Sequence, residues 1–131
     1  MPEYMLLLYA PDTSEDAEQE KARWAEMPEW LEVTESLRKA GLLVANAPLH
    51  PVAAATTVRV RDGEADLTDG PFAVTKEILA GYYILACADL DEALKQAERF
   101  PIARYGSVEV RPIMDDPTEN PVGDGAASAA A

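Results

Sequence analysis

Two short apolar runs constrain the fold of this chain more than any other feature. The runs are Tyr4–Tyr9 (YMLLLY), which Pro11 ends, and Gly81–Ala88 (GYYILACA), which Asp89 follows. A membrane-spanning helix needs about 20 apolar residues, so both runs are too short to cross a bilayer. Their length is typical of strands that are buried on both faces. They therefore predict two central strands of one sheet.

A helical pattern follows the first of these runs. Apolar residues recur at helical spacing from Trp24 to Ala40, and Pro28 inside this segment predicts a kink or two short helices. Thr13 and Asp16 resemble a capping box ahead of this segment. We therefore expect a broken helix between the first strand and a short second strand at residues 42–45.

The second half of the chain contains a hairpin, a further helix and a last strand. Residues 56–68 alternate between apolar and polar side chains around Asp62-Gly63, a favoured two-residue turn. Residues 89–97 have the pattern of a capped helix, and residues 107–111 alternate as a strand. The order strand, helix, strand, hairpin, strand, helix, strand predicts an α+β fold, a ferredoxin-like split βαβ sandwich with an inserted hairpin.

One domain is expected, and a homodimer. Two helices can cover only one face of the predicted sheet, and a second copy of the chain is the simplest cover for the other. Residues 1–114 form the domain. Residues 115–131 are acidic, rich in alanine, proline and glycine, and cannot bury enough apolar surface to fold, so we expect a disordered tail.

The charge and composition exclude several classes of function. A net charge of -13 repels phosphate backbones and anionic lipids, which argues against nucleic-acid and membrane partners. The single Cys87 cannot form an internal disulfide, and the start of the chain lacks a basic leader, so we expect a cytoplasmic protein. No metal-ligand spacing, phosphate loop or dinucleotide motif is present. Catalysis, if present, would then be acid–base chemistry without a cofactor or metal.

The candidate site centres on the loop at residues 69–77, which begins Asp69-Gly70-Pro71-Phe72. Asp and Gly suit a turn, Pro fixes the next φ, and Phe72 offers an apolar anchor or a substrate contact. Histidine is the side chain whose ordinary pKa lies near neutrality, and His50 is the only one in the chain. His50 as general base, oriented by Asp69, is the predicted catalytic pair. The simpler alternatives are an exposed loop histidine and an acid that caps its own turn.

Two cations complete the predicted site. Lys76 could bind an anionic group, or form a surface ion pair with Glu77. Arg111 shares one strand face with Glu109, where ion pairing is the usual explanation. If that face lines a cleft between two copies, however, the Arg111 guanidinium could hold a carboxylate.

These residues carry a resemblance to a known family. The quoted segments are Tyr4–Leu7, Thr56–Arg59, Asp69–Ala73, Thr75–Glu77, Gly81–Tyr83, Asp89–Ala93 and Gly106–Pro112. Together they resemble the YCII-related family, in the branch named for the DGPF motif. Val74 stands where that motif usually has an acid. The resemblance implies a dimeric α+β barrel of ferredoxin-like subunits, and some members are thought to use a His-Asp pair with the histidine on the first helix. This chain has no histidine there.

The resemblance implies two kinds of function. Some relatives carry out dehalogenase or lyase-like chemistry on small molecules, which favours a cofactor-independent lyase, isomerase or dehydrochlorinase acting in a dimer cleft. DGPF proteins also occur beside sigma factors of the extracytoplasmic-function type, which makes an accessory protein that binds a sigma factor the alternative. The acidic first helix would then be the contact surface.

Overall fold

The computed structural model describes residues 1–114 of the chain. The tail predicted at residues 115–131 lies outside the described residues. Four antiparallel strands form the main sheet in the order β2-β5-β1-β6. Their bounds are Glu3–Ala10 for β1, Leu43–Pro48 for β2, Ile78–Ala86 for β5 and Ser107–Pro112 for β6. The two apolar runs thus occupy the two central strands, as predicted, and the order is the one that a split βαβ arrangement requires.

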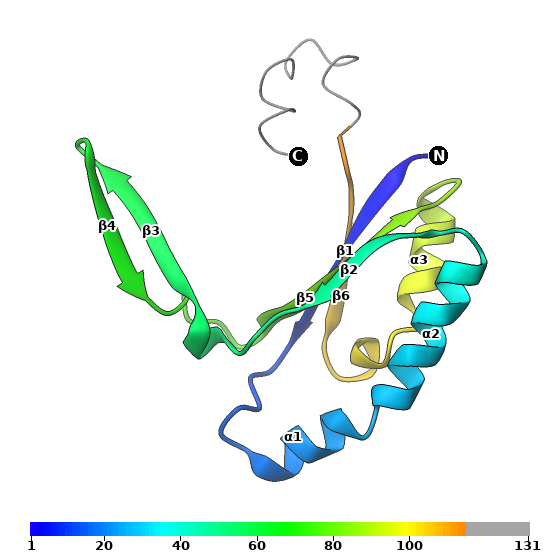
Figure 1. Cartoon of the computed structure of the whole chain (residues 1–131), viewed down its shortest axis with the longest axis horizontal. Coiled ribbons are helices and arrows are strands. Elements are labelled where there is room, and N and C mark those ends of the chain that lie inside the picture. The colour runs from blue at the N-terminus through cyan, green and yellow to red at the C-terminus, as the bar shows by residue number, and fades with distance from the viewer. Residues whose placement is uncertain (115–131) are drawn as a thin grey trace.

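The helices lie on one side of this sheet (Figure 1). They are α1 (Ala17–Trp24), α2 (Met27–Lys39) and α3 (Leu90–Ala97), with short 3-10 turns η1 (Val52–Ala54) and η2 (Pro101–Arg104). The predicted break is confirmed, because α1 ends at Trp24 and Pro28 lies in the first turn of α2. No helix in residues 1–114 is both long and apolar enough to cross a membrane.

The core lies between the sheet and helices α2 and α3. Alternate residues of β1 and β5 face these helices and are buried, among them Leu6, Tyr83 and Leu85. Helix α2 contributes Val33 and Leu37. The remaining buried side chains come from α3, η2 and their flanks, and include Ala93, Ala97, Phe100 and Ile102. The two central strands are therefore fully buried on one face only.

The other face of the sheet has no helix over it, and we call it the open face. Its central residues are half-buried and apolar: Met5 and Leu7 on β1, paired with Ile84 and Tyr82 on β5. Glu109 and Arg111 on β6 lie opposite Leu7 and Met5 and give this face a charged edge. The expectation that β1 and β5 are buried on both faces therefore fails for the single chain.

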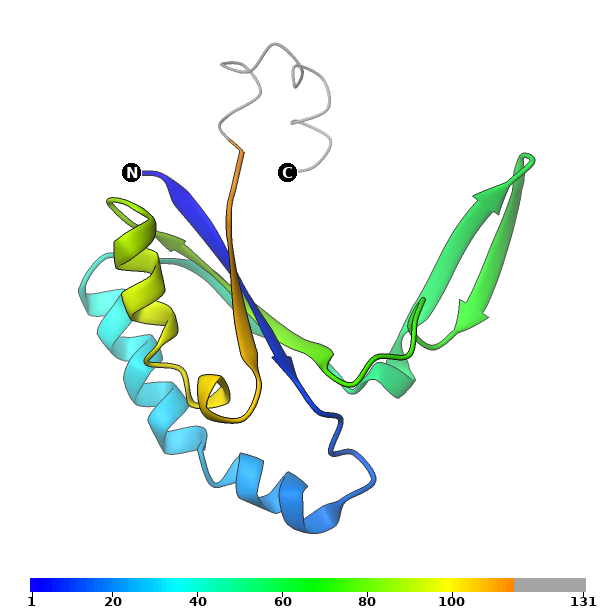
Figure 2. The ribbon, with the colours of Figure 1, turned by 180° about the vertical axis from the view of Figure 1, so that it is seen from behind.

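The hairpin of β3 (Thr56–Arg61) and β4 (Glu64–Asp69) forms a sheet of its own. Asp62 and Gly63 make the predicted turn, both with positive φ. The hairpin extends away from the helices as an arm (Figures 1 and 2), so nearly all of its residues are exposed.

Candidate functional site

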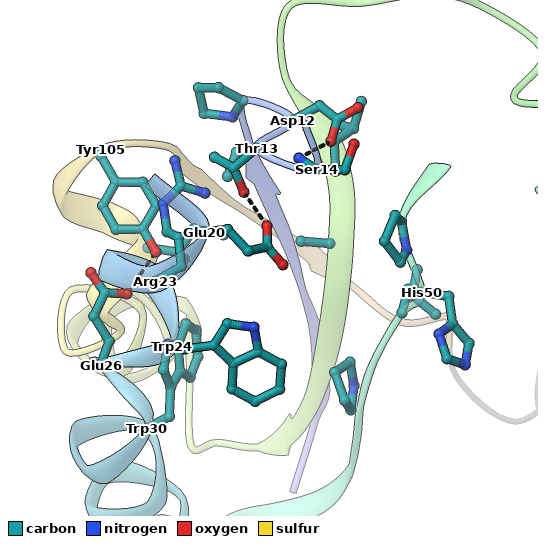
Figure 3. Close-up of a pocket in the computed structure, with 18 residues that line it drawn as sticks. Asp12, Thr13, Ser14, Glu20, Arg23, Trp24, Glu26, Trp30, His50 and Tyr105 are labelled. Carbon is teal, nitrogen blue, oxygen red and sulfur yellow. Dashed lines mark hydrogen bonds between the residues drawn. The ribbon is translucent and has the colours of Figure 1, made fainter. Parts of the chain in front are cut away.

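A cavity of about 500 Å³ lies between α1 and one end of the main sheet, and we call it the helix pocket. Helix α1 stands off from the sheet here, whereas α2 packs on it (Figure 1). Ten of the lining residues are labelled in Figure 3: Asp12, Thr13, Ser14, Glu20, Arg23, Trp24, Glu26, Trp30, His50 and Tyr105. Acids, a base and two indoles thus share one cavity.

Glu20 is the carboxylate that the fold holds most directly at this cavity. The Thr13 hydroxyl donates a hydrogen bond of 2.9 Å to Oε2 of Glu20, and Thr13 is only 8% exposed. Within residues 1–114, no hydrogen bond reaches the other oxygen, Oε1. Figure 3 shows this carboxylate extending from α1 into the space between the helix and the strands. Glu20 is therefore oriented by one oxygen and has the other available to a bound molecule.

The start of α1 explains this arrangement. Asp16, by itself, caps the helix by accepting a hydrogen bond of 3.1 Å from the Gln19 backbone N–H. Thr13 is therefore not part of a capping box, and that prediction is wrong. Asp12 accepts a hydrogen bond from the Ser14 N–H, which lowers the pKa of Asp12. These hydrogen bonds fix the loop before α1, and this loop directs the Thr13 hydroxyl toward Glu20.

A second polar group joins the helices to η2. The Tyr105 hydroxyl donates to Glu26 Oε1 at 2.7 Å, and the Arg23 guanidinium carbon lies 4.0 Å from the centre of the Tyr105 ring. Arg104 donates two hydrogen bonds to Glu29, at 2.7 and 2.9 Å. Burial and then the bond to Glu26 raise the pKa of Tyr105 well above its ordinary value, so this phenol stays protonated at neutral pH.

Replacing Tyr105 with phenylalanine tests that bond. The folded protein holds the Tyr105 proton more tightly than the unfolded chain does. Its contribution to stability is therefore complete below the ordinary tyrosine pKa of 10.0 and is lost as the pH rises above that value. We expect Tyr105→Phe to cost about 1–2 kcal/mol at neutral pH and to lose less stability than the wild type above pH 10. Urea denaturation at several pH values measures both effects. If the free energy of unfolding depends on pH in the same way in the two proteins, the raised pKa of Tyr105 is contradicted.

A further cavity of about 630 Å³, the loop cavity, lies beside the loop at residues 69–77. His50, Phe72 and Glu77 are among its lining residues, and His50 also lines the helix pocket. Phe72 is 77% exposed, so the expectation that it anchors the loop by burial is wrong. The loop is held instead through Gly70, whose N–H donates to the Ala55 carbonyl at 2.7 Å. Gly70 has φ +98, which explains the glycine at this turn.

The remaining predicted residues are spread over the molecule. Asp69 ends β4 opposite Thr56, and no hydrogen bond or ion pair joins it to His50 in residues 1–114. Lys76 is exposed on the loop. Arg111 lies on the open face, 3.9 Å from Glu109. The structure therefore brings His50 and Phe72 to one cavity and leaves Arg111 on another surface.

Sequence reasoning singled out His50 but missed the residues that α1 contributes to the helix pocket. The missing histidine on the first helix was a usable signal, because it directs attention to whichever polar side chain of that helix faces the sheet. The structure places Glu20 and Arg23 there. His50 lies across the pocket from them, with its ring pointing away (Figure 3). Within residues 1–114, no group of three potential metal ligands comes together.

Comparisons with known proteins identify relatives of this chain. An uncharacterized protein of Rhizobium meliloti (strain 1021) is 49% identical over 77 residues, which are 57% of this chain and 62% of that relative. The matched region thus spans less than two thirds of the relative's length. The family described as "YCII-related domain" matches residues 3–116, which include every strand and helix described above. The chain therefore belongs to the YCII-related family.

Proposed function

We propose that this protein binds a small organic molecule in the helix pocket and carries out acid–base chemistry on it without a cofactor, as a lyase or isomerase. The observation that supports this most is the position of Glu20. One of its oxygens is held by the buried Thr13 hydroxyl and the other accepts no hydrogen bond within residues 1–114. A carboxylate fixed in this way at a cavity wall is suited to take a proton from a bound substrate.

In such a reaction Glu20 removes a proton from a carbon beside an electron-withdrawing group. The electron pair of the broken C–H bond then forms a double bond and expels a leaving group, or returns to another carbon with a proton. His50, predicted from the sequence as the general base, lies on the facing wall and would be the second group for that proton in this proposal. Its side chain is exposed, so its ring can turn toward the pocket on the fast timescale of surface side chains. Asp69 remains a predicted partner of His50.

The chemistry can be tested with 5-nitrobenzisoxazole, a chromogenic probe of proton abstraction. A base takes the proton from carbon 3, the C–H electrons complete a nitrile, and the N–O bond breaks to release a coloured phenolate. We expect the protein to accelerate this reaction with saturation, and Glu20→Gln to slow it by about 100-fold. Glu18→Gln is the matched control, because Glu18 is an exposed acid of the same helix. A Glu20→Gln variant as fast as the wild type would overturn the assignment.

The open face supports a homodimer as part of this proposal. It is apolar at its centre, and a second copy of the chain would bury Met5, Leu7, Tyr82 and Ile84 together. Such a pairing would make the dimeric barrel and would place Arg111 and Glu109 at the contact between subunits. We also place the chain in the DGPF branch, on the motif at residues 69–72, and in the cytoplasm.

Partnership with a sigma factor is the alternative proposal. It depends on the acidic first helix as a contact surface. Three side chains of α1, namely Glu20, Arg23 and Trp24, line the helix pocket. The geometry therefore favours a small molecule over a protein as the partner of this helix.

A further inference from the structure

The helix pocket borders a second cavity of about 450 Å³ between α2 and β2, which we call the apolar annex. Trp30, Pro48, Ala80 and Ile102 line both cavities, so the two meet along this shared wall. The helix pocket and the annex therefore lie side by side, and we call the two cavities together the channel.

Acidic side chains are confined to one end of this channel. Asp12, Glu20 and Glu26 against Arg23 give the helix pocket a net charge of −2, from three acids and one base. Arg38 is the one charged residue that lines the annex, and it is already paired with Glu35. An anionic head group would meet a negative field at the first end. In the annex, an apolar group would lie beside few charged side chains.

The hydroxyl groups of the annex are also occupied. Thr34 Oγ1 and the Tyr83 hydroxyl are hydrogen-bonded to each other at 2.6 Å, and Thr34 also donates to the Trp30 carbonyl at 2.8 Å. The Tyr83 ring stacks at 6.2 Å from that of Trp30. A polar ligand group would gain little from these two hydroxyls, because both already have partners.

An exposed apolar stripe runs along the helical side of the channel. Trp24, Met27 and Leu31 are spaced by three and four residues and are 64%, 39% and 62% exposed. Trp24 lines the helix pocket, whereas Met27 and Leu31 line the annex. These side chains contribute little to the core, so a bound apolar chain is the occupant that would remove them from water.

We propose that the substrate has an uncharged polar head, which lies in the helix pocket, and an apolar tail, which crosses the Trp30–Pro48 wall into the annex. This inference rests on the proposed function for the head group. It adds the class of molecule: neutral carbonyl or hydroxyl compounds with an apolar chain, in preference to carboxylates and to small molecules that lack a tail.

Tryptophan fluorescence can test this directly, because both tryptophans of the chain, Trp24 and Trp30, line the channel. The probes are straight-chain 2-alkanones of increasing length and the carboxylates of the same lengths. For the ketones, we expect affinity to rise about three- to fourfold with each added methylene until the annex is filled. Carboxylates of equal length should bind at least tenfold more weakly. Affinity that is independent of ketone length, or carboxylates that bind as tightly, would overturn the proposal.

A variant in the annex distinguishes the tail from the head. Leu31→Asp places a charge at an exposed annex position and should remove the dependence on chain length while leaving the shortest ketone unchanged. Leu94→Asp, on an exposed position of α3 outside both cavities, is the matched control. If the control loses the dependence equally, the tail binds elsewhere and the proposal fails. If ketone binding depends on chain length but the protein does not turn over 5-nitrobenzisoxazole, the catalytic proposal alone fails. If Glu20→Gln slows that turnover but ketone binding does not depend on chain length, the proposal of an apolar tail alone fails.

Discussion

Phe100→Ala is expected to lower the free energy of unfolding by about 3–5 kcal/mol, the range for a fully buried aromatic residue. Phe100 is 0% exposed at the start of η2. Its ring lies 4.6 Å from the Tyr83 ring and 5.5 Å from that of Trp30, both of which line the apolar annex. The substitution would therefore leave a cavity beneath the wall of the proposed site. Urea denaturation, read by tryptophan fluorescence, measures the loss.

The chain supplies its own control, since Phe72 is its only other phenylalanine. Phe72 is 77% exposed on the loop at residues 69–77, so Phe72→Ala should change stability by no more than about 0.5 kcal/mol. Equal losses from the two substitutions would show that Phe72 is buried in solution. That result would restore its predicted role as the anchor of the loop.

The order and the kinds of elements could be predicted because local patterns determine them. The Asp62-Gly63 turn, the proline at position 28 and the two apolar runs each act within a few residues. The open face was inferred from the number of helices, and the half-burial of Leu7 and Ile84 agrees with that inference. What these patterns could not show is that the hairpin forms a sheet separate from the main one.

The helix pocket could not be predicted because it depends on contacts between distant segments. Glu20 and Tyr105 reach one cavity only through the way α1 stands off from the sheet while η2 packs close to β1. The sequence predicts Thr13 to be a helix cap, because serine and threonine are among the residues preferred at that position. Its bond to Glu20, seven residues away, appears only in three dimensions. The predicted contact between His50 and Asp69 is absent from residues 1–114 for the same reason. His50 follows β2, whereas Asp69 ends a hairpin that extends away from the sheet.

The open face leads to the second prediction: Ile84→Glu should convert the proposed homodimer into a monomer. Ile84 lies on the central strand β5, between Met5 on β1 and Ala45 on β2. Full burial of an isoleucine contributes about 1.5–3 kcal/mol, and Ile84 is already half-buried in the single chain, so each copy would gain about half of this. A two-fold axis counts the residue twice, and the resulting loss of about 1.5–3 kcal/mol corresponds to a dimer weakened by roughly 10- to 10²-fold. Two carboxylates brought to one apolar surface would add to this loss.

Sedimentation equilibrium of the wild type and the variant measures this change, and circular dichroism shows whether the variant remains folded. Leu94→Glu is the control, because Leu94 is 44% exposed on α3, in the helical layer on the other side of the sheet. A wild-type monomer, or an Ile84→Glu protein that dimerises as tightly as the wild type, would show that the open face is not the contact. Glu20 lies on α1, in the helical layer and away from the open face, so its proposed action on 5-nitrobenzisoxazole should survive in a folded Ile84→Glu monomer. Loss of that activity together with the dimer would mean that the partner subunit completes the site.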